Sequence, residues 1–317
     1  MRLLSLVCLA RCAALPDIGV TYAATGRLNV LMAAESVRRL STRYAHVHTL
    51  SADDHATCER LRGGAPWKCV DVTSGSSHAV QLWRHLAKYT AADAPCRNSH
   101  SIAPTRLLKM VAIAAAPFRH NIFLDADTVP CFDLATLYTQ LRAGGGMGLL
   151  DVYDLLLVPA RESVPSGPAA AKGTWRAPAY DKSNSGVILW RKSRATMKLY
   201  HSWIHAYCSE KKLGTRGSAE SNGADQNVLS YEILHAVKRD RLLVYSLGPW
   251  WNYRSWRRHF GNAPACCSTE RASTASDREP PPIYIDHACR KPREYAARSG
   301  NASYFLGDGD DAGRRRV

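Results

Sequence analysis

The sequence contains no apolar run long enough to cross a bilayer. The best candidate, residues 3–10, is followed by Arg11 and falls well short of the roughly 18 residues that a spanning helix needs. This absence excludes a multi-pass membrane protein and predicts no integral membrane span. The same stretch lies between Met1-Arg2 and Ala13-Ala14, which predicts over residues 1–16 either a secretory signal or a frayed leader without a targeting role.

Cysteine pairs of the metal-binding type are also missing. The ten cysteines include no Cys-x-x-Cys pair, which argues against a structural zinc site. Disulfides in an oxidising lumen remain open, and the single glycosylation sequon at Asn301 fits that compartment. We expect the secretory pathway or Golgi lumen, with the cytoplasm as the alternative.

Acidic residues are scarce relative to basic ones. The 317 residues include 42 Lys and Arg against 27 Asp and Glu, a formal net charge of +15, and 46% of the residues are hydrophobic. The hydrophobic content excludes a disordered chain, and the charge favours phosphorylated substrates, anionic lipids or polyanions as partners. No internal repeat is present, and the length fits one large or two small domains.

Strand and helix patterns alternate along the chain. This alternation predicts an α/β fold with a mostly parallel central sheet and helices on both faces. Apolar and β-branched runs predict strands over residues 18–24, 46–50, 68–72, 120–124, 147–152, 185–190, 242–246 and 283–285. Helical spacing of apolar residues predicts helices over residues 28–40, 80–89, 104–115, 132–141, 195–208 and 224–237.

Two acids stand where the predicted strand 120–124 ends. Asp125 and Asp127 follow its apolar run, and ligands of open α/β sheets bind outside the carboxyl ends of the strands. Two carboxylates two positions apart on an extended backbone can converge on one cation, and such oxygen ligands suit Mn²⁺ or Mg²⁺. The alternative interpretation is a solvated turn.

Residues 109–130, which include these acids, resemble the centre of a GT-A type nucleotide-diphospho-sugar glycosyltransferase, similar to the glycogenin-like (family 8) and related Asp-x-Asp transferases. Three later segments, residues 182–187, 223–227 and 285–292, resemble further motifs of that family and occur in its order. The resemblance implies one domain over residues 17–293. In it, a Rossmann-like nucleotide-binding half would be joined to an acceptor-binding half, and a loose tail would follow over residues 294–317.

The resemblance implies a metal site as well as a donor site. Asp125, Asp127 and His287 would hold Mn²⁺ or Mg²⁺, with Asp125 sharing the metal or holding a ribose hydroxyl, and Lys291 would neutralise the leaving diphosphate. A satisfied structural role is the alternative for His287. Only residues 288–290 separate His287 from Lys291, a shorter spacer than in the glycogenin-like enzymes, so the neighbouring arginines Arg290 or Arg293 are alternative phosphate contacts and the stereochemical outcome stays open.

The same resemblance implies roles around the sugar and the nucleotide. Asp225, Gln226 and Asn184 would form the catalytic and sugar-binding set, although an acid that only favours its helix terminus and a simple turn are the alternatives for Asp225 and Asn184. Lys109 is a candidate donor contact, with a solvated helix face as its alternative. The nucleotide base and ribose are expected at the end of the first strand, beside Tyr22, Ala23 and Thr25.

The predicted function is therefore metal-dependent transfer of a sugar from a nucleotide-diphosphate donor to a hydroxyl acceptor on a glycan, protein or small molecule. Two alternatives remain. Asp125 also fits the nucleophile motif of a haloacid-dehalogenase-type phosphatase, with residues 307–311 imitating its late acidic motif. A non-catalytic sugar-nucleotide-binding module is the second alternative.

Aromatic and basic residues alternate over residues 250–259. They could pack a loop on the core, stack on acceptor sugars, or stack on nucleic-acid bases. No nucleic-acid partner is expected, because no recognised nucleic-acid-binding module accompanies them.

Overall fold

The computed structural model describes residues 18–87, 103–141, 148–159, 183–208, 225–247, 251 and 285–287. Within these ranges, no helix combines the length and the apolar character that crossing a membrane requires. The strands are β1 Ile18–Ala24, β2 Ala45–Thr49, β3 Lys68–Asp71, β4 His120–Asp125, β5 Thr128–Pro130, β6 Leu155–Pro159, β7 Ser183–Arg191, β8 Val244–Ser246 and β9 Ile285–His287. The helices are α2 Arg27–Arg39, α3 Ala52–Arg62, α4 His78–Ala87, α5 Ala103–Ala114, α6 Leu134–Gln140, α7 Leu149–Val152, α9 Arg194–Cys208 and α10 Asp225–Asp240.

The main sheet has seven strands in the order β3-β2-β1-β4-β7-β6-β8, and β5 pairs with β9 in a separate two-stranded sheet. Neighbouring strands from β3 to β4 are parallel, β7 is antiparallel to both β4 and β6, and β8 is parallel to β6. One strand therefore opposes six, which confirms the predicted α/β fold with a mostly parallel sheet.

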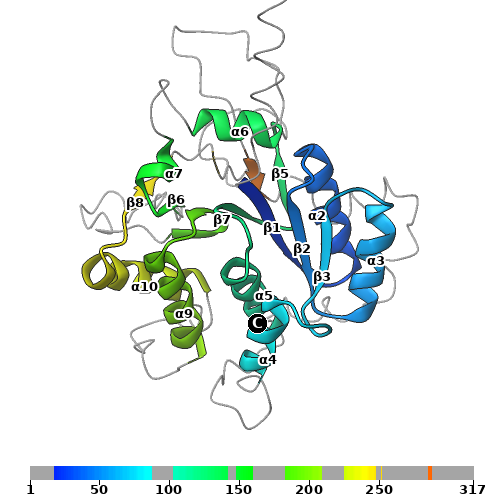
Figure 1. Ribbon diagram of the computed structural model, residues 1–317, viewed down its shortest axis with the longest axis horizontal. Coiled ribbons are helices and arrows are strands. Elements are labelled where there is room, and N and C mark those ends of the chain that lie inside the picture. Colours follow the sequence, from blue (N-terminus) through cyan, green and yellow to red (C-terminus); the bar gives the residue numbers. More distant parts are fainter. Residues whose placement is uncertain are drawn as a thin grey trace, which may run out of the picture.

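Helices cover both faces of this sheet (Figure 1). Alternation along β4 shows why: Phe123 packs in the core cluster with α4, α5, α9 and α10, whereas Ile122 and Leu124 pack in the cluster with α2, α3, α6 and α7. Both clusters are rich in side chains with almost no exposed surface. Burial on two faces explains the nearly continuous apolar character of β4 and β7.

One predicted strand is wrong. Residues 149–152 form the short helix α7, in which the Asp151 carboxylate accepts the Gly148 N–H at 3.0 Å, and the strand comes later, at Leu155–Pro159. An acid that closes a single helical turn on the preceding backbone competes with strand formation. The last predicted strand, 283–285, is shifted to Ile285–His287.

Helix α3, absent from the sequence prediction, begins with Ser51, whose hydroxyl accepts the Asp54 N–H. A disulfide between Cys58 and Cys69 ties this helix to β3, and Cys131 is also disulfide-bonded. The sequence left the pairing open; the first pair spans 11 positions of the chain.

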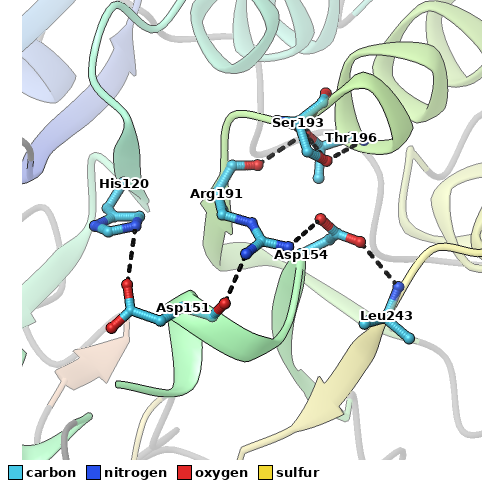
Figure 2. A network of polar contacts seen from close by, with 7 residues as sticks. All are labelled: His120, Asp151, Asp154, Arg191, Ser193, Thr196 and Leu243. Atoms are coloured by element: carbon cyan, nitrogen blue, oxygen red, sulfur yellow. Dashed lines mark hydrogen bonds and ion pairs between the residues drawn. The ribbon is translucent and has the colours of Figure 1, made fainter. Parts of the chain in front are cut away.

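Polar contacts tie the amino-terminal edge of the sheet together (Figure 2). The Arg191 guanidinium donates to the Asp151 backbone oxygen at 2.7 Å and to Asp154 Oδ1 at 2.9 Å, and Asp154 Oδ2 accepts the Leu243 N–H at 3.1 Å. Burial alone would raise the pKa of Asp154, but the Arg191 and Leu243 hydrogen bonds hold it below its usual value. This network fixes the end of β7 beside the starts of β6 and β8.

Two histidines on β2 make stability sensitive to acid. Burial, reinforced by the Lys68 charge, lowers the pKa of His46 to about 4, and burial, reinforced by His46, lowers that of His48 to about 3. Because the unfolded chain takes up protons near pH 6.5 while the folded chain does not, stability is fully present above that pH and is lost as pH falls toward 4.

We expect His48→Gln to make the free energy of unfolding less dependent on pH. Between about pH 7.5 and about pH 4.5, the free energy of unfolding of the wild type should fall by about 2 kcal/mol more than that of the variant. Urea unfolding at both pH values measures the difference. Parallel losses in the two proteins would show that other groups carry the acid sensitivity.

Candidate functional site

Strand β4 delivers Asp125 to the carboxyl-terminal edge of the sheet. Asp125 is the last residue of β4 and lies beside Ala23 of the parallel strand β1. Ala126 and Asp127 then form a turn into β5, and the Thr128 hydroxyl closes it by donating to the Asp125 backbone oxygen at 2.7 Å. The two acids therefore lie at the sheet edge where this class of fold binds ligands.

A buried lysine stands at the centre of the site. Lys109 of α5 is 9% exposed, and its Nζ lies 2.9 Å from Asp125 Oδ1 and 3.3 Å from Asp225 Oδ2. Burial alone would lower the pKa of Lys109, but the two carboxylates raise it above its usual value. The solvated helix face considered for this residue is wrong: Lys109 is a fixed charge that joins two distant acids.

Asp225, the first residue of α10, is held by contacts from three other elements. Its Oδ2 accepts the Ser185 hydroxyl of β7 at 2.7 Å, Arg106 of α5 lies 4.0 Å from its Oδ1, and its backbone oxygen accepts Trp203 Nε1–H of α9 at 3.0 Å. Burial alone would raise the pKa of Asp225, yet Lys109, Ser185 and Arg106 hold it below its usual value. Asp225 is therefore an anion with fixed geometry.

Strand pairing brings the predicted late histidine to the acidic turn. In the antiparallel β5–β9 pair, Thr128 lies opposite His287. The backbone of His287 is thus placed beside the residue that follows Asp127, although about 160 positions of the chain separate them. This register brings the two segments that carry the predicted metal ligands, the turn 125–127 and strand β9, side by side.

The residues expected to contact the nucleotide differ in where their side chains lie. The Tyr22 side chain is fully buried in the core, where its hydroxyl bonds Ser36 Oγ at 2.8 Å, so as a side-chain contact to a donor this prediction is wrong. Burial raises the pKa of Tyr22 strongly. Thr25 lies within reach of α5, with its Oγ1 3.3 Å from Thr105 Oγ1. Ala23 and Thr25 thus remain beside the site.

Of the remaining predicted residues, Gln226 lies beside Asp225, Asn184 bonds its own strand, and Lys291 is not described. Gln226 follows Asp225 on α10, and its buried Oε1 accepts no hydrogen bond from the residues that the structure describes. Asn184 is buried in β7 and uses its Oδ1 to accept the Gly186 N–H at 2.6 Å, so its neighbour Ser185, not Asn184, bonds Asp225. Lys291 lies outside the described residues.

Two residues of this cluster were missed from the sequence. Arg106 precedes Lys109 by three positions on α5 and therefore shares its helix face. Ser185 stands inside the segment quoted for the family resemblance but was assigned no role. The helical spacing of the two cations was the available signal for Arg106; nothing local marks Ser185.

The donor set fits a divalent metal on its chemistry. Two carboxylates on one turn with an imidazole-bearing residue paired beside it offer the oxygen and nitrogen ligands that Mn²⁺ accepts. Lys109 Nζ lies 2.9 Å from Asp125 Oδ1, and Asp127 follows in the turn that leads into β5, the partner strand of β9. Among the side chains that the structure describes, no three His, Cys, Asp or Glu residues converge; the side chain of His287 is not among them.

No protein-family model matches the sequence, and no curated protein matches it. Several solved structures are similar to this chain at low sequence identity. Apo mouse xyloside xylosyltransferase 1 is 14% identical, with a TM-score of 0.46 over 86% of this chain and 97% of its own. Apo glycosyltransferase GlyE of Streptococcus pneumoniae TIGR4 is 11% identical, with a TM-score of 0.43 over 86% of this chain and 54% of its own. A glycosyltransferase involved in glycosylation of the major capsid of PBCV-1 is 11% identical, with a TM-score of 0.37 over 89% of this chain and 98% of its own.

Proposed function

We propose that the protein is a metal-dependent GT-A type glycosyltransferase that moves a sugar from a nucleotide-diphosphate donor to a hydroxyl acceptor. The observation that carries the proposal is the convergence of distant segments at one sheet edge. The β5–β9 register sets His287 against the Asp125–Asp127 turn, while Lys109 joins that turn to Asp225.

In this proposal the turn side of the site holds the metal and the donor diphosphate. Asp127 and His287 would bind Mn²⁺ or Mg²⁺ with Asp125, and the bound metal would stabilise the charge that develops on the leaving diphosphate. Lys291, or Arg290 or Arg293 in its place, would contact the same diphosphate. Fixed cations there stabilise the transition state more than the ground state, because negative charge grows as the sugar leaves.

The other side of the cluster would hold the sugar. Asp225 remains ionised and rigid, so its carboxylate can accept hydrogen bonds from sugar hydroxyls, and the buried Oε1 of Gln226 offers a further acceptor beside it. We assign Asp225 and Gln226 to sugar binding and catalysis. The position of Asn184 leaves it a supporting role, through the backbone of β7.

We also propose a compartment and a domain. The Cys58–Cys69 disulfide supports an oxidising lumen such as that of the secretory pathway, with residues 1–16 as the signal and residues 17–293 as the catalytic domain. The aromatic segment over residues 250–259 lies mostly outside the described residues, and its member Trp251 is buried in the core, which supports packing for that residue.

Incubation of the protein with a panel of sugar nucleotides, with and without Mn²⁺, tests the proposal. We expect one donor to give metal-dependent release of nucleotide diphosphate, increased by the correct acceptor and abolished by a chelator. Asp225→Asn should lose this activity, whereas Asp53→Asn, which changes an exposed acid of α3 in the same way, should keep it.

Each competing function predicts a different result. Hydrolysis of a generic phosphate ester that Asp125→Asn abolishes, with no donor turned over, would establish the phosphatase. Tight metal-dependent donor binding without turnover for any acceptor would establish a binding module.

A further inference from the structure

A basic pocket lies at the edge of the sheet opposite Asp125. It has a volume of about 500 Å³, and the start of α9 and the end of α10 supply its charged lining: Arg194, Lys198, Arg239, Asp240 and Arg241. Asp154 and Ser193 of the polar network in Figure 2 also line it. In the β4–β7 pair, His120 lies opposite Arg191, so this pocket faces away from the candidate active site.

The charges in this pocket do not cancel. Asp154 is paired with Arg191, and Asp240 alone opposes four cations, contacting Lys198 and Arg239 at 2.8 Å each. The side chains of Arg194 and Arg241 form no hydrogen bond or ion pair with any residue in the described ranges. The pocket therefore has an excess of three positive charges and two guanidinium groups available to a ligand.

Arg241 also has an unusual backbone conformation. It follows α10 with a φ of 55°, in the left-handed region where a helix end usually has glycine. An arginine at such a position costs conformational energy, so its side chain is expected to serve a purpose that glycine cannot. The turn at Arg241 leads directly from α10 to β8.

Exposed apolar side chains continue this surface. All large apolar side chains that are exposed among the described residues lie on α7, on α10 or at β8: Val152, Tyr231, Val237, Leu243 and Tyr245, which are 37–50% exposed. Leu243 and Tyr245 follow the pocket residue Arg241 along the chain, and Val237 precedes the pocket residue Arg239. The Leu243 N–H bonds Asp154, and the Tyr245 ring contacts Tyr153 at 5.0 Å. In Figure 1 the three elements lie on one side of the molecule, and within the described ranges β8 pairs with β6 only.

We propose that this docking surface, defined as Arg194, Lys198, Arg239 and Arg241 with the apolar residues Val237, Leu243 and Tyr245, binds the protein to an anionic lipid bilayer. The pocket receives a headgroup phosphate at Arg194 and Arg241, and the apolar side chains enter the headgroup region. Basic and apolar side chains on one face are the combination that holds a peripheral protein on a charged membrane. Charge alone would fit any polyanion; the exposed apolar residues favour the bilayer.

Docking at this edge leaves the candidate active site open. Strand β4 has six residues, which separates its two ends by about 17 Å. A membrane at the Arg241 end would thus leave Asp125 facing the solution. Anionic lipids give the cytoplasmic leaflet its negative surface potential, so this proposal favours the cytoplasm over the lumen proposed above. It does not depend on the proposed enzymatic function, because vesicle binding is measured without a donor or metal.

Vesicle sedimentation tests the docking surface. The probes are vesicles of phosphatidylcholine alone and vesicles in which about a third of the lipid is phosphatidylserine. We expect binding to the second kind only, weakened at about 0.5 M salt because screening shortens the range of the attraction.

The decisive variant is Arg194→Glu/Arg241→Glu, which should lower the partition coefficient at least about tenfold, since each basic residue contributes on the order of a fivefold factor. Leu243→Ser should weaken the binding that persists at high salt. The matched control is Arg43→Glu/Lys68→Glu, which makes the same change of net charge at exposed positions near the opposite edge strand β3 and should bind like the wild type.

Three results would overturn the proposal. Equal losses in the variant and in the control would assign binding to the overall charge of +15. Unchanged binding by the variant would place the contact elsewhere. Binding of free inositol trisphosphate without vesicle binding would make the pocket a site for a soluble anion. If the charge-reversal variant does not fold, Arg194→Gln/Arg241→Gln removes the same cations more gently and decides the same question.

Discussion

Replacing Asp127 by Asn is expected to lower metal-dependent release of nucleotide diphosphate on the order of a hundredfold or more. Asp127 lies in the turn after β4, next to the residue that pairs with His287. The substitution keeps the size of the side chain and removes its negative charge, so the loss should come from weaker metal binding.

Titration of the protein with Mn²⁺, followed by the paramagnetic signal of the free ion, measures this weakening independently of turnover. We expect the affinity of Asp127→Asn for Mn²⁺ to fall at least about tenfold. Asp53→Asn, which changes an exposed acid of α3 in the same way, serves as the control for both measurements. If Asp127→Asn binds Mn²⁺ normally and turns over normally, the turn is a structural feature and the metal site is wrong.

The β5–β9 pair shows both what sequence could predict and where it stopped. The short apolar run before Asp125 predicts a buried strand that ends at the edge where ligands bind, and the structure confirms that placement. That His287 would lie opposite Thr128 follows from a pairing across about 160 positions of the chain. No local pattern encodes such a pairing, and only the family resemblance suggested it.

Side-chain burial limited the prediction of the site most. A lysine on an amphipathic helix normally reaches the solvent, and nothing around Lys109 marks it as facing the sheet. Its burial depends on Asp125 and Asp225, which reach it from β4 and α10. Tyr22 shows the opposite error: it stands near the end of β1, but alternation along the strand turns its ring into the core.

The wrongly predicted strand and the missed helix both arise where short polar contacts to the backbone outweigh the hydrophobic pattern. Residues 149–152 have strand-like composition but form a helical turn through Asp151 and Gly148, and the apolar run that follows supplies β6. Helix α3 has almost no apolar face, and its buried residues include Asp54 and Thr57. Its signals were its caps, Ser51 and Gly63, not its periodicity.

Replacing Lys109 by Met is expected to destabilise the protein by about 3 kcal/mol, the low end of the cost of breaking a buried ion pair. The Asp125 and Asp225 side chains are only 27% and 13% exposed, so removing the ammonium leaves two carboxylates poorly solvated and close to a common point. The low end applies because the more exposed Asp125 is partly screened by solvent. Urea unfolding measures the change, and Lys192→Met, which removes an exposed lysine at the other edge of the sheet, should leave stability close to the wild type.

The dependence of this loss on pH separates charge from packing. In the wild type the pKa of Asp225 is depressed, so the stability that it contributes is present above pH 3.8 and is lost as pH falls below that value. The difference in unfolding free energy between Lys109→Met and wild type should therefore be largest near neutral pH and shrink as the acids become protonated.

Adding Asp225→Asn to Lys109→Met removes one of the two uncompensated charges and should recover about half of the lost stability. A loss that does not change with pH, and that Asp225→Asn does not reduce, would mean that Lys109 stabilises the fold by packing on Phe123, which its Nζ approaches at 5.3 Å, and that the two acids are held without it.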